Sequence, residues 1–142
     1  MYDAIILSYA GIQSLKMNNE VSEIFSVEEF IPSAGQGIIC LQCRENDDEI
    51  LSILEKVNHK ETSQRANAER NVLKILEGDC ETAVGAHAKI YGNEISLETE
   101  LFSLDGSQRF YEKKTAKTEK AKELGTEVGK ILKLKSNNLY KR

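Results

Sequence analysis

The residue of this chain best suited to chemistry is Cys80, which lies between a predicted helix and a predicted strand. A thiol on a loop between a helix end and a sheet edge is exposed to anything held in a neighbouring cleft. Its neighbours Asp79 and Glu81, together with the negative end of the preceding helix, disfavour the thiolate form. The local residues therefore leave two interpretations open: a nucleophile for a very reactive electrophile, and an unreactive cysteine in a turn.

The other cysteines and the two histidines offer less chemistry. Cys40 and Cys43 form a C-x-x-C, but on a predicted strand residues three apart point to opposite faces and do not chelate an ion. His59 and His87 are far apart in the sequence, and a surface or core position is the default for each. Because no second Cys or His pair stands at zinc spacing, we predict no metal site.

A glycine-containing segment, Ser33–Gly37, follows Pro32, the only proline of the chain. Its backbone N–H groups could approach an anion closely, because glycine carries no side chain there. The segment lacks the Gly-Lys-Ser/Thr of a P-loop, and taken alone it is more typical of a hinge or turn than of a ligand contact. Further along, Arg70 could bind a carboxylate or phosphate, or lie on a solvated helix face.

Composition narrows the class of protein. The chain has 142 residues, of which 40% are hydrophobic and 30% charged, as in a soluble globular protein of one ordinary domain or two small ones. A net charge of -4 argues against bulk binding to nucleic acid. No apolar stretch reaches transmembrane length and no signal peptide is visible. Three cysteines, an odd number, fit a reducing cytoplasm.

Residues 1–57 are expected to form isolated elements. We predict strands at 3–7 and 38–43, a helix at 8–16, a short helix near 21–25, and a helix that begins at Asn46 or Asp47 and ends at Val57. A short buried strand needs neighbours on both sides, and this half of the chain does not supply them. We infer that these pieces complete sheets formed by another part of a longer chain.

Residues 58–134 are expected to form a compact domain. Asn58 and Glu61 have the spacing of a capping box, and Gly78 is a natural C′ residue for the helix between them. Strands are predicted at 84–91, 95–101 and 108–114, joined by Gly92-Asn93 and Asp105-Gly106, and a helix at 118–134. This order predicts an α+β domain, a three-stranded antiparallel sheet with helices on one side.

Taken together, the segments resemble hydroxymethylbilane synthase, also called porphobilinogen deaminase, over essentially the whole chain. The matching residues run in the family's order: Tyr2–Leu7, Ala10-Gly11, Ile31–Gly37, Cys43-Arg44, Asn58-His59, Ala68–Arg70, Leu76–Gly78, Cys80, Val84-Gly85 and Asp105-Gly106. The resemblance implies a cytoplasmic transferase of heme and porphyrin biosynthesis. Its members join four porphobilinogen units, with loss of ammonia, into the linear tetrapyrrole.

The resemblance also implies a site. It assigns to Cys80 a thioether to a dipyrromethane cofactor, formed with an azafulvene that needs no strongly acidified thiol. It assigns Arg44 and the backbone of Gly35, Gln36 and Gly37 to the cleft where acetate and propionate groups of cofactor and substrate bind. The family's catalytic aspartate has no counterpart in this chain, so no residue is predicted to be catalytic.

The family has three domains, which implies that this chain is the C-terminal portion only. Residues 1–31 would end domain 2, residues 32–57 would return to domain 1, and residues 58–142 would be domain 3. The first two would be incomplete pieces of α/β domains like those of periplasmic binding proteins. The missing N-terminal domains would be partners required for turnover, and exposed apolar surface in residues 1–39 predicts self-association.

Several residues depart from the family pattern. Ser14 stands where an arginine of the cleft is usual, Asp79 replaces a glycine, and Thr82-Ala83 replaces a pair that usually ends in proline. The alternative to an enzyme part is a protein of another class, namely a non-catalytic remnant or a small α+β interaction domain in which Cys80 is unmodified.

Overall fold

The computed structural model describes residues 3–78 and 82–141. It divides the chain into two compact units, Met1–Phe30 and Ile31–Arg142. The first unit holds helix α1 (Tyr9–Ser14) and the short 3-10 helix η1 (Asn18–Glu20), with the rings of Phe25 and Phe30 stacked 5.8 Å apart. A helix within 8–16 is confirmed. The short helix expected near 21–25 is wrong, because the only turn of helix there ends at Glu20.

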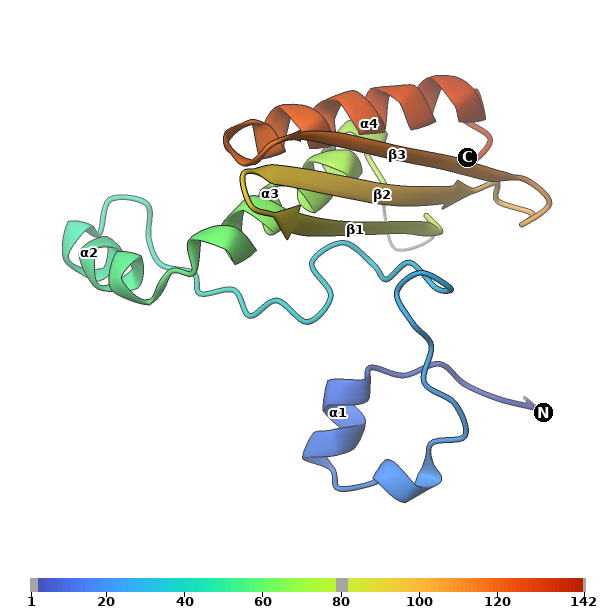
Figure 1. The fold of residues 1–142 in the computed structure, drawn as a ribbon, viewed down its shortest axis with the longest axis horizontal. Helices are drawn as coiled ribbons and strands as arrows, with labels where there is room; N and C mark the ends of the chain where they lie inside the picture. The colour runs from blue at the N-terminus through green and yellow to red at the C-terminus, as the bar shows by residue number, and fades with distance from the viewer. Residues whose placement is uncertain (1–2, 79–81, 142) are drawn as a thin grey trace. The chain divides into compact units, whose positions relative to one another are not determined.

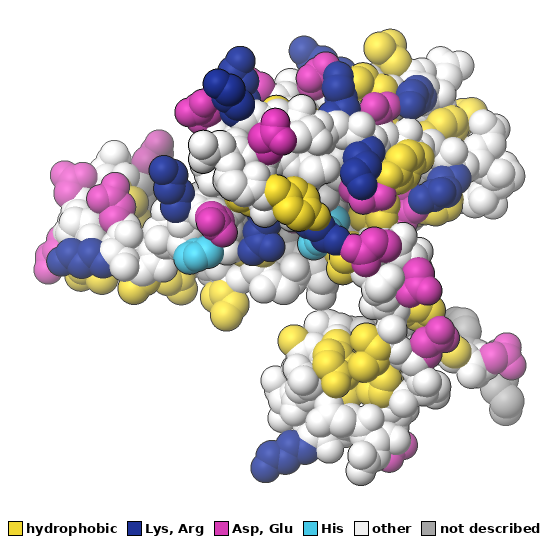
Figure 2. All heavy atoms as spheres, in the orientation of Figure 1, with side chains coloured by type: hydrophobic (Ala, Val, Ile, Leu, Met, Phe, Trp, Pro, Cys, Tyr) yellow, Lys and Arg dark blue, Asp and Glu magenta, His cyan; other side chains and the backbone are white. Residues whose placement is uncertain are grey.

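The two strands predicted in the N-terminal half are absent from the described residues. Segments 3–7 and 38–43 have no regular secondary structure, and most of their apolar side chains are exposed, 63% for Ile6 and 90% for Ile39. The reason is that a strand is stabilised by hydrogen bonds to its neighbours, and no described segment pairs with either one. Figure 2 shows hydrophobic side chains gathered on the visible face of the first unit.

The second unit begins its helices with polar caps. Helix α2 (Asp48–Val57) starts at Asp47, whose carboxylate accepts the Ile50 N–H at 3.3 Å, as the sequence predicts. Helix α3 (Lys60–Leu76) starts at His59, whose Nδ1 accepts the Thr62 N–H at 3.3 Å. The capping box expected at Asn58 is therefore wrong by one residue, because the imidazole supplies the acceptor.

The end of α3 also differs from the prediction by one residue. Glu77, with a φ of 54°, takes the left-handed position that we expected for Gly78, and the Gly78 N–H donates to the Leu73 carbonyl at 3.4 Å. Lys133 Nζ and Lys141 Nζ lie 2.9 and 3.3 Å from the exposed Glu77 carboxylate. Lys133 is the larger cause of a lowered pKa of Glu77.

Three strands form one antiparallel sheet in the order β1-β2-β3 (Figure 1). They are β1 (Val84–Tyr91), β2 (Glu94–Phe102) and β3 (Arg109–Lys117). The tight turns use Gly92 and Gly106, whose φ values of 59° and 70° favour glycine. The predicted meander is confirmed, with β3 displaced by a few residues along the sequence.

Helices α3 and α4 (Ala121–Ser136) cover one face of the sheet (Figure 1), and the 3-10 helix η2 (Thr118–Lys120) precedes α4. The two helices approach each other closely at Gly125, where an added Cβ would lie 2.1 Å from the Ala68 carbonyl oxygen. The α+β architecture is confirmed. Between sheet and helices lies one core, formed by Ala68, Val72, Leu76, Ala88, Ile95, Leu97, Leu101, Ala121, Leu124, Val128, Leu132 and Tyr140.

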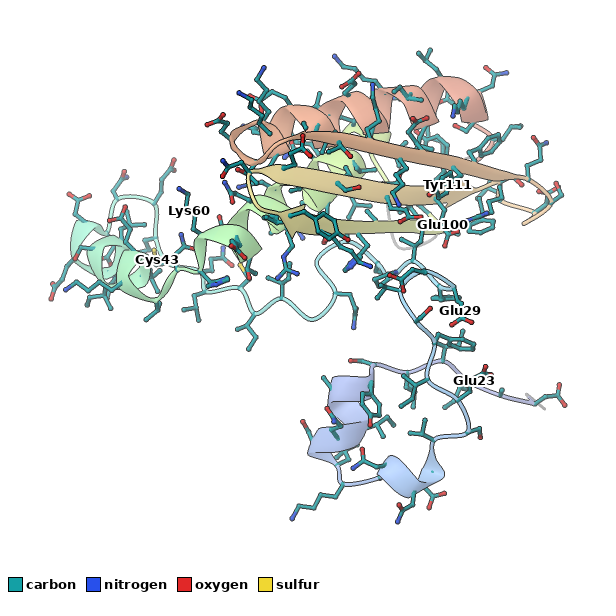
Figure 3. The ribbon with its side chains drawn as sticks, viewed as in Figure 1. Glu23, Glu29, Cys43, Lys60, Glu100 and Tyr111 are labelled. Atoms are coloured by element: carbon teal, nitrogen blue, oxygen red, sulfur yellow. The ribbon has the colours of Figure 1, made fainter. Side chains whose placement is uncertain are left out.

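The opposite face of the sheet is polar and mixed in charge. Tyr111 on β3 lies opposite Glu100 on β2 in the register, and Figure 3 shows both side chains over this face. The Tyr111 hydroxyl donates to Glu98, and burial followed by this carboxylate raises the pKa of Tyr111 to about 12. Basic and acidic side chains alternate across this part of the surface (Figure 2). No helix in the described part of the chain is long and apolar enough to span a bilayer.

Candidate functional site

The segment Ser33–Gly37 folds as two consecutive turns. The Gln36 N–H donates to the Ser33 carbonyl at 3.0 Å, and the Ile38 N–H donates to the Gly35 carbonyl at 3.0 Å. Gly35 and Gly37 both have a φ of 77°, so each glycine occupies a backbone conformation that other residues adopt only with strain. The glycines of this loop are therefore explained by the turns themselves.

The residues before the loop lie along the free edge of β1. The Ala86 N–H donates to the Pro32 carbonyl at 2.9 Å, as in a short additional strand contact. Gly85 permits this approach, because an added Cβ would lie 2.6 Å from the Ile31 carbonyl oxygen. Ile31 is itself buried, with 4% of its surface exposed, so the segment is anchored by an apolar side chain as well.

Glu69 of α3 joins the loop to the sheet. Its carboxylate is buried and accepts two backbone N–H groups, from Gly35 at 2.7 Å and from Ala88 at 2.8 Å. His87 lies close by, with Nδ1 4.0 Å from Glu69 Oε1. One side chain thus contacts the loop, the helix on which it lies and the edge of β1.

A hollow of about 370 Å³ opens beside this junction. It holds two side chains that can carry positive charge, Arg65 and His87. Arg65 donates to the Thr62 hydroxyl at 3.2 Å. The hollow is lined by Gln36, Gly37, Ile38, Ile39, Thr62, Arg65, Glu69 and His87. Because the Glu69 carboxylate is already engaged by two N–H donors, this combination of groups suits a small anion such as a carboxylate.

A second hollow, of about 490 Å³, is more apolar. Segment 38–41 and helices α2 and α3 form it, and its polar side chains include His59 and Arg70. The exposed apolar residues of segment 38–41 form one wall. Arg70 thus borders a hollow and is exposed on α3. This position fits both predicted roles, a contact with a carboxylate or phosphate and a place on a solvated helix face.

The structure brings together part of the predicted site. Gly35 lines the second hollow, and Gln36 and Gly37 line the first. Of the three N–H groups, those of Gly35 and Gln36 are already used within the protein, whereas that of Gly37 has no hydrogen bond among the described residues. Of these three residues, Gly37 is therefore the one whose backbone N–H can donate to a ligand.

Arg44 and Cys43 line neither hollow, whereas Cys40 borders the second one. Arg44 Nη2 contacts Asp47 Oδ2 at 2.7 Å with 88% of its side chain exposed. Cys40 is exposed and Cys43 is half-buried, and both are free thiols. Figure 3 labels Cys43 in the segment before α2. They lie in irregular backbone, so the face argument based on a strand does not apply. Cys80 lies outside the described residues.

No group of three or more metal-ligating side chains occurs in segments 3–78 and 82–141. Sequence reasoning did not find Glu69, Arg65 or the contact of His87 with Glu69. The sequence did contain a signal for Glu69. Its spacing from Val72 and Leu76 places it on the same face of the helix as these two core residues. An acidic residue on the buried stripe of a helix indicates a specific hydrogen-bond partner.

Comparison with known proteins decides the family. Residues 63–134 match the model of the porphobilinogen deaminase C-terminal domain. This chain belongs to the porphobilinogen deaminase family. Residues 1–52 match the family's dipyromethane cofactor binding domain. The family comprises transferases of porphyrin and heme biosynthesis, and its cofactor is dipyrromethane.

Curated porphobilinogen deaminases align with most of the chain. The protein of Desulforamulus reducens is 38% identical over 130 residues, which is 92% of this chain and 42% of that protein. The protein of Coxiella burnetii is 37% identical over 131 residues, 92% of this chain and 43% of that protein. The chain therefore spans less than half the length of these relatives.

Proposed function

We propose that this chain is the C-terminal part of a hydroxymethylbilane synthase and carries the dipyrromethane cofactor on Cys80. The whole enzyme would join four porphobilinogen units with loss of ammonia. The observation that carries the proposal is the consecutive match to a cofactor-binding domain and a C-terminal domain in a chain that covers 42% of a relative. Without the remaining part, which would hold the catalytic aspartate, the chain should not turn over.

The polar groups around the Ser33–Gly37 loop fit such a cofactor. A dipyrromethane carries acetate and propionate groups, and when bound it supplies the pyrrole to which substrate units are added. Gly37 N–H, Arg65 and His87 border one hollow and can meet carboxylates. The hydrogen bonds of Gly35 and Gln36 would keep the loop in its conformation. Arg44 would bind a carboxylate of the cofactor or substrate in place of its present partner, Asp47.

The proposed assignment of residues 1–31, 32–57 and 58–142 to domains 2, 1 and 3 accounts for the exposed apolar segments. In the whole enzyme, segments 3–7 and 38–43 would pair with strands of the missing part. The exposed side chains of Ile6 and Ile39 would then be buried. This proposal makes the separate chain a candidate for reconstitution with a complementary piece.

Reconstitution is the test of the proposed function. The residues of the Desulforamulus reducens protein that precede its match to this chain would be produced as a second chain and mixed with this one. We expect porphobilinogen consumption only in the mixture, and none when Cys80→Ser replaces the wild type. Cys40→Ser is the matched control and should keep the activity. Turnover by the isolated wild-type chain would contradict the proposal.

A second candidate is a non-catalytic remnant with an unmodified Cys80, favoured by the acidic Asp79 that replaces a family glycine. Intact-mass measurement separates the two candidates. Added mass of one dipyrromethane, lost in Cys80→Ser, supports the cofactor-bearing enzyme part. A wild-type chain that stays unmodified in the mixture and after exposure to the tetrapyrrole product supports the remnant.

A further inference from the structure

We infer that Glu69 is a positioning residue that fastens the Ser33–Gly37 loop to the C-terminal α+β domain and so sets the loop for its ligand. What the loop binds rests on the proposed function; the fastening does not. Glu69 is 34 residues from Gly35 and 19 residues from Ala88 in sequence, yet its two oxygens accept both N–H groups at 2.7 and 2.8 Å. A single carboxylate thus bridges three segments.

The burial of Glu69 indicates that this arrangement is specific. Only 4% of its surface is exposed, and a carboxylate taken out of water is costly unless hydrogen bonds replace its hydration. Each oxygen here has a backbone donor, and hydrogen bonds to a charged acceptor are stronger than neutral ones. An apolar residue would fill the same core position of α3 but would leave the Gly35 and Ala88 N–H groups without this acceptor.

The chemistry of the side chain separates positioning from simple packing. A carboxylate offers two acceptor oxygens, whereas the amide of glutamine offers one acceptor and one donor group. Glutamine has the same size, so it preserves packing, but its NH₂ would face one of the two N–H donors. Glu69→Gln therefore removes half of the fastening and introduces a clash between donors, with little change in volume.

The fastening bears on the hollow beside the loop. Gly35 is held by Glu69, and the turns that follow Gly35 determine where Gln36 and Gly37 line the hollow. Glu69 itself lines this hollow beside Arg65 and His87, and its two N–H donors offset only part of its negative charge. Glu69 thus acts on anion binding through the position of the loop.

Amide hydrogen exchange of this chain tests the fastening without cofactor. In Glu69→Gln we expect the Gly35 and Ala88 amides to exchange roughly tenfold faster or more, as the loss of a charge-assisted hydrogen bond predicts. The amides of Leu97 and Leu101, on the central strand β2, should keep their protection. Tyr140→Phe is the control, since it removes a buried hydrogen bond of the same domain away from the loop.

Two outcomes would overturn the fastening. One is unchanged exchange at Gly35 and Ala88 in Glu69→Gln. The other is an equal acceleration of both amides in Tyr140→Phe that exceeds the acceleration of Leu97 and Leu101 in the same variant. If Glu69→Gln does not fold, Glu69→Asp gives the same test, because a side chain shorter by one methylene cannot reach both N–H groups. In the wild type, the two amide protons should resonate downfield of the other loop amides, and should lose that shift in either variant.

Cofactor loading tests the consequence for the ligand. In the two-chain enzyme exposed to the tetrapyrrole product, Glu69→Gln should form the Cys80 thioether more slowly than wild type, as followed by intact mass, whereas Tyr140→Phe should load at the wild-type rate when the two are compared at equal folded fraction. Equal loading rates in a variant with a released loop would overturn the ligand-positioning role. Failure of the proposed function itself is distinct: the wild type would then carry no dipyrromethane at all, whatever the exchange data show.

Discussion

The hydroxyl group of Tyr140 donates a 2.8 Å hydrogen bond to the carbonyl oxygen of Leu76, which lies 64 residues earlier in the sequence. Tyr140 is almost completely buried, so this bond joins the last residues of the chain to the end of α3 inside the core. Lys133 and Lys141 contact the neighbouring Glu77 from the same side. The end of α3, from which the chain continues toward Cys80, is therefore held by the C-terminal tail.

Tyr140→Phe should destabilise the domain by about 1–3 kcal/mol, because it leaves the buried Leu76 carbonyl without this donor while keeping the ring. Chemical denaturation followed by circular dichroism measures the change. Tyr91→Phe is the matched control, since Tyr91 is exposed on the sheet, and it should change the free energy of unfolding by less than about 0.5 kcal/mol. Equal effects of the two substitutions would contradict the role given to Tyr140.

Gly125→Ala should destabilise the packing of α4 on α3. The added Cβ would lie 2.1 Å from the Ala68 carbonyl oxygen, so the two helices must separate, and overpacking of this kind costs about 1–3 kcal/mol or more. Gly11→Ala in α1 is the control, because nothing lies within 4 Å of its added Cβ. Thermal unfolding should show a lower melting temperature for Gly125→Ala alone. An unchanged melting temperature would mean that the helices are farther apart than described.

Asp105 should make the turn between β2 and β3 sensitive to acid. The Ser103 hydroxyl, followed by the Ser107 N–H and hydroxyl, lowers the pKa of Asp105 from 3.8 to about 2. Because the folded-state pKa lies below the unfolded one, the stabilisation is complete above pH 3.8 and is lost as the pH falls toward 2.

Carboxyl-carbon NMR titration measures this pKa directly. In Ser103→Ala, the pKa of Asp105 should move back toward 3.8, because the largest cause of the shift is removed. Glu123→Gln, on α4, should leave it in place. A wild-type Asp105 that titrates near 3.8 would show that the hydrogen bonds of this turn do not persist in solution.

The exposed apolar segment before α2 should promote self-association of the isolated chain. Ile39 is 90% exposed and Leu41 60% exposed, and burial of such side chains against another copy is favourable. The double substitution Ile39→Asp and Leu41→Asp should shift light scattering toward monomer. Lys120→Asp, on the short helix η2, controls for added negative charge. A wild type that is already monomeric at high concentration would contradict this expectation.

The C-terminal domain could be predicted from sequence because its determinants are local. Alternating residues in β2, glycines at 92 and 106, and the apolar stripe of α4 each specify their element without distant help. Segments 3–7 and 38–43 have equally strong apolar patterns but formed no strand. Each of these segments lacks a neighbouring strand to which it can hydrogen-bond, and the pattern within one segment does not show whether such a neighbour exists.

The candidate site was only partly predictable for a related reason. The Ser33–Gly37 loop was found from its glycines, but its contact with Glu69 joins residues that the sequence separates widely. The sequence drew attention to Arg70, the exposed neighbour, with a solvated helix face as one of its two interpretations, but not to the buried carboxylate beside it. The caps at His59 and Glu77 were each missed by one residue, because tertiary contacts and side-chain geometry decided between adjacent candidates.

The contacts of Pro32 and Glu69 with β1 have a further consequence for how this sheet can meet other chains. β1 is an edge strand, and an edge strand offers its outward N–H groups as a template for strand addition. Here the outward N–H groups of Ala86 and Ala88 are already occupied, one by a proline carbonyl and one by a carboxylate. A foreign strand would have to displace both before it could extend the sheet, so the edge is protected against fibril-like growth from this side.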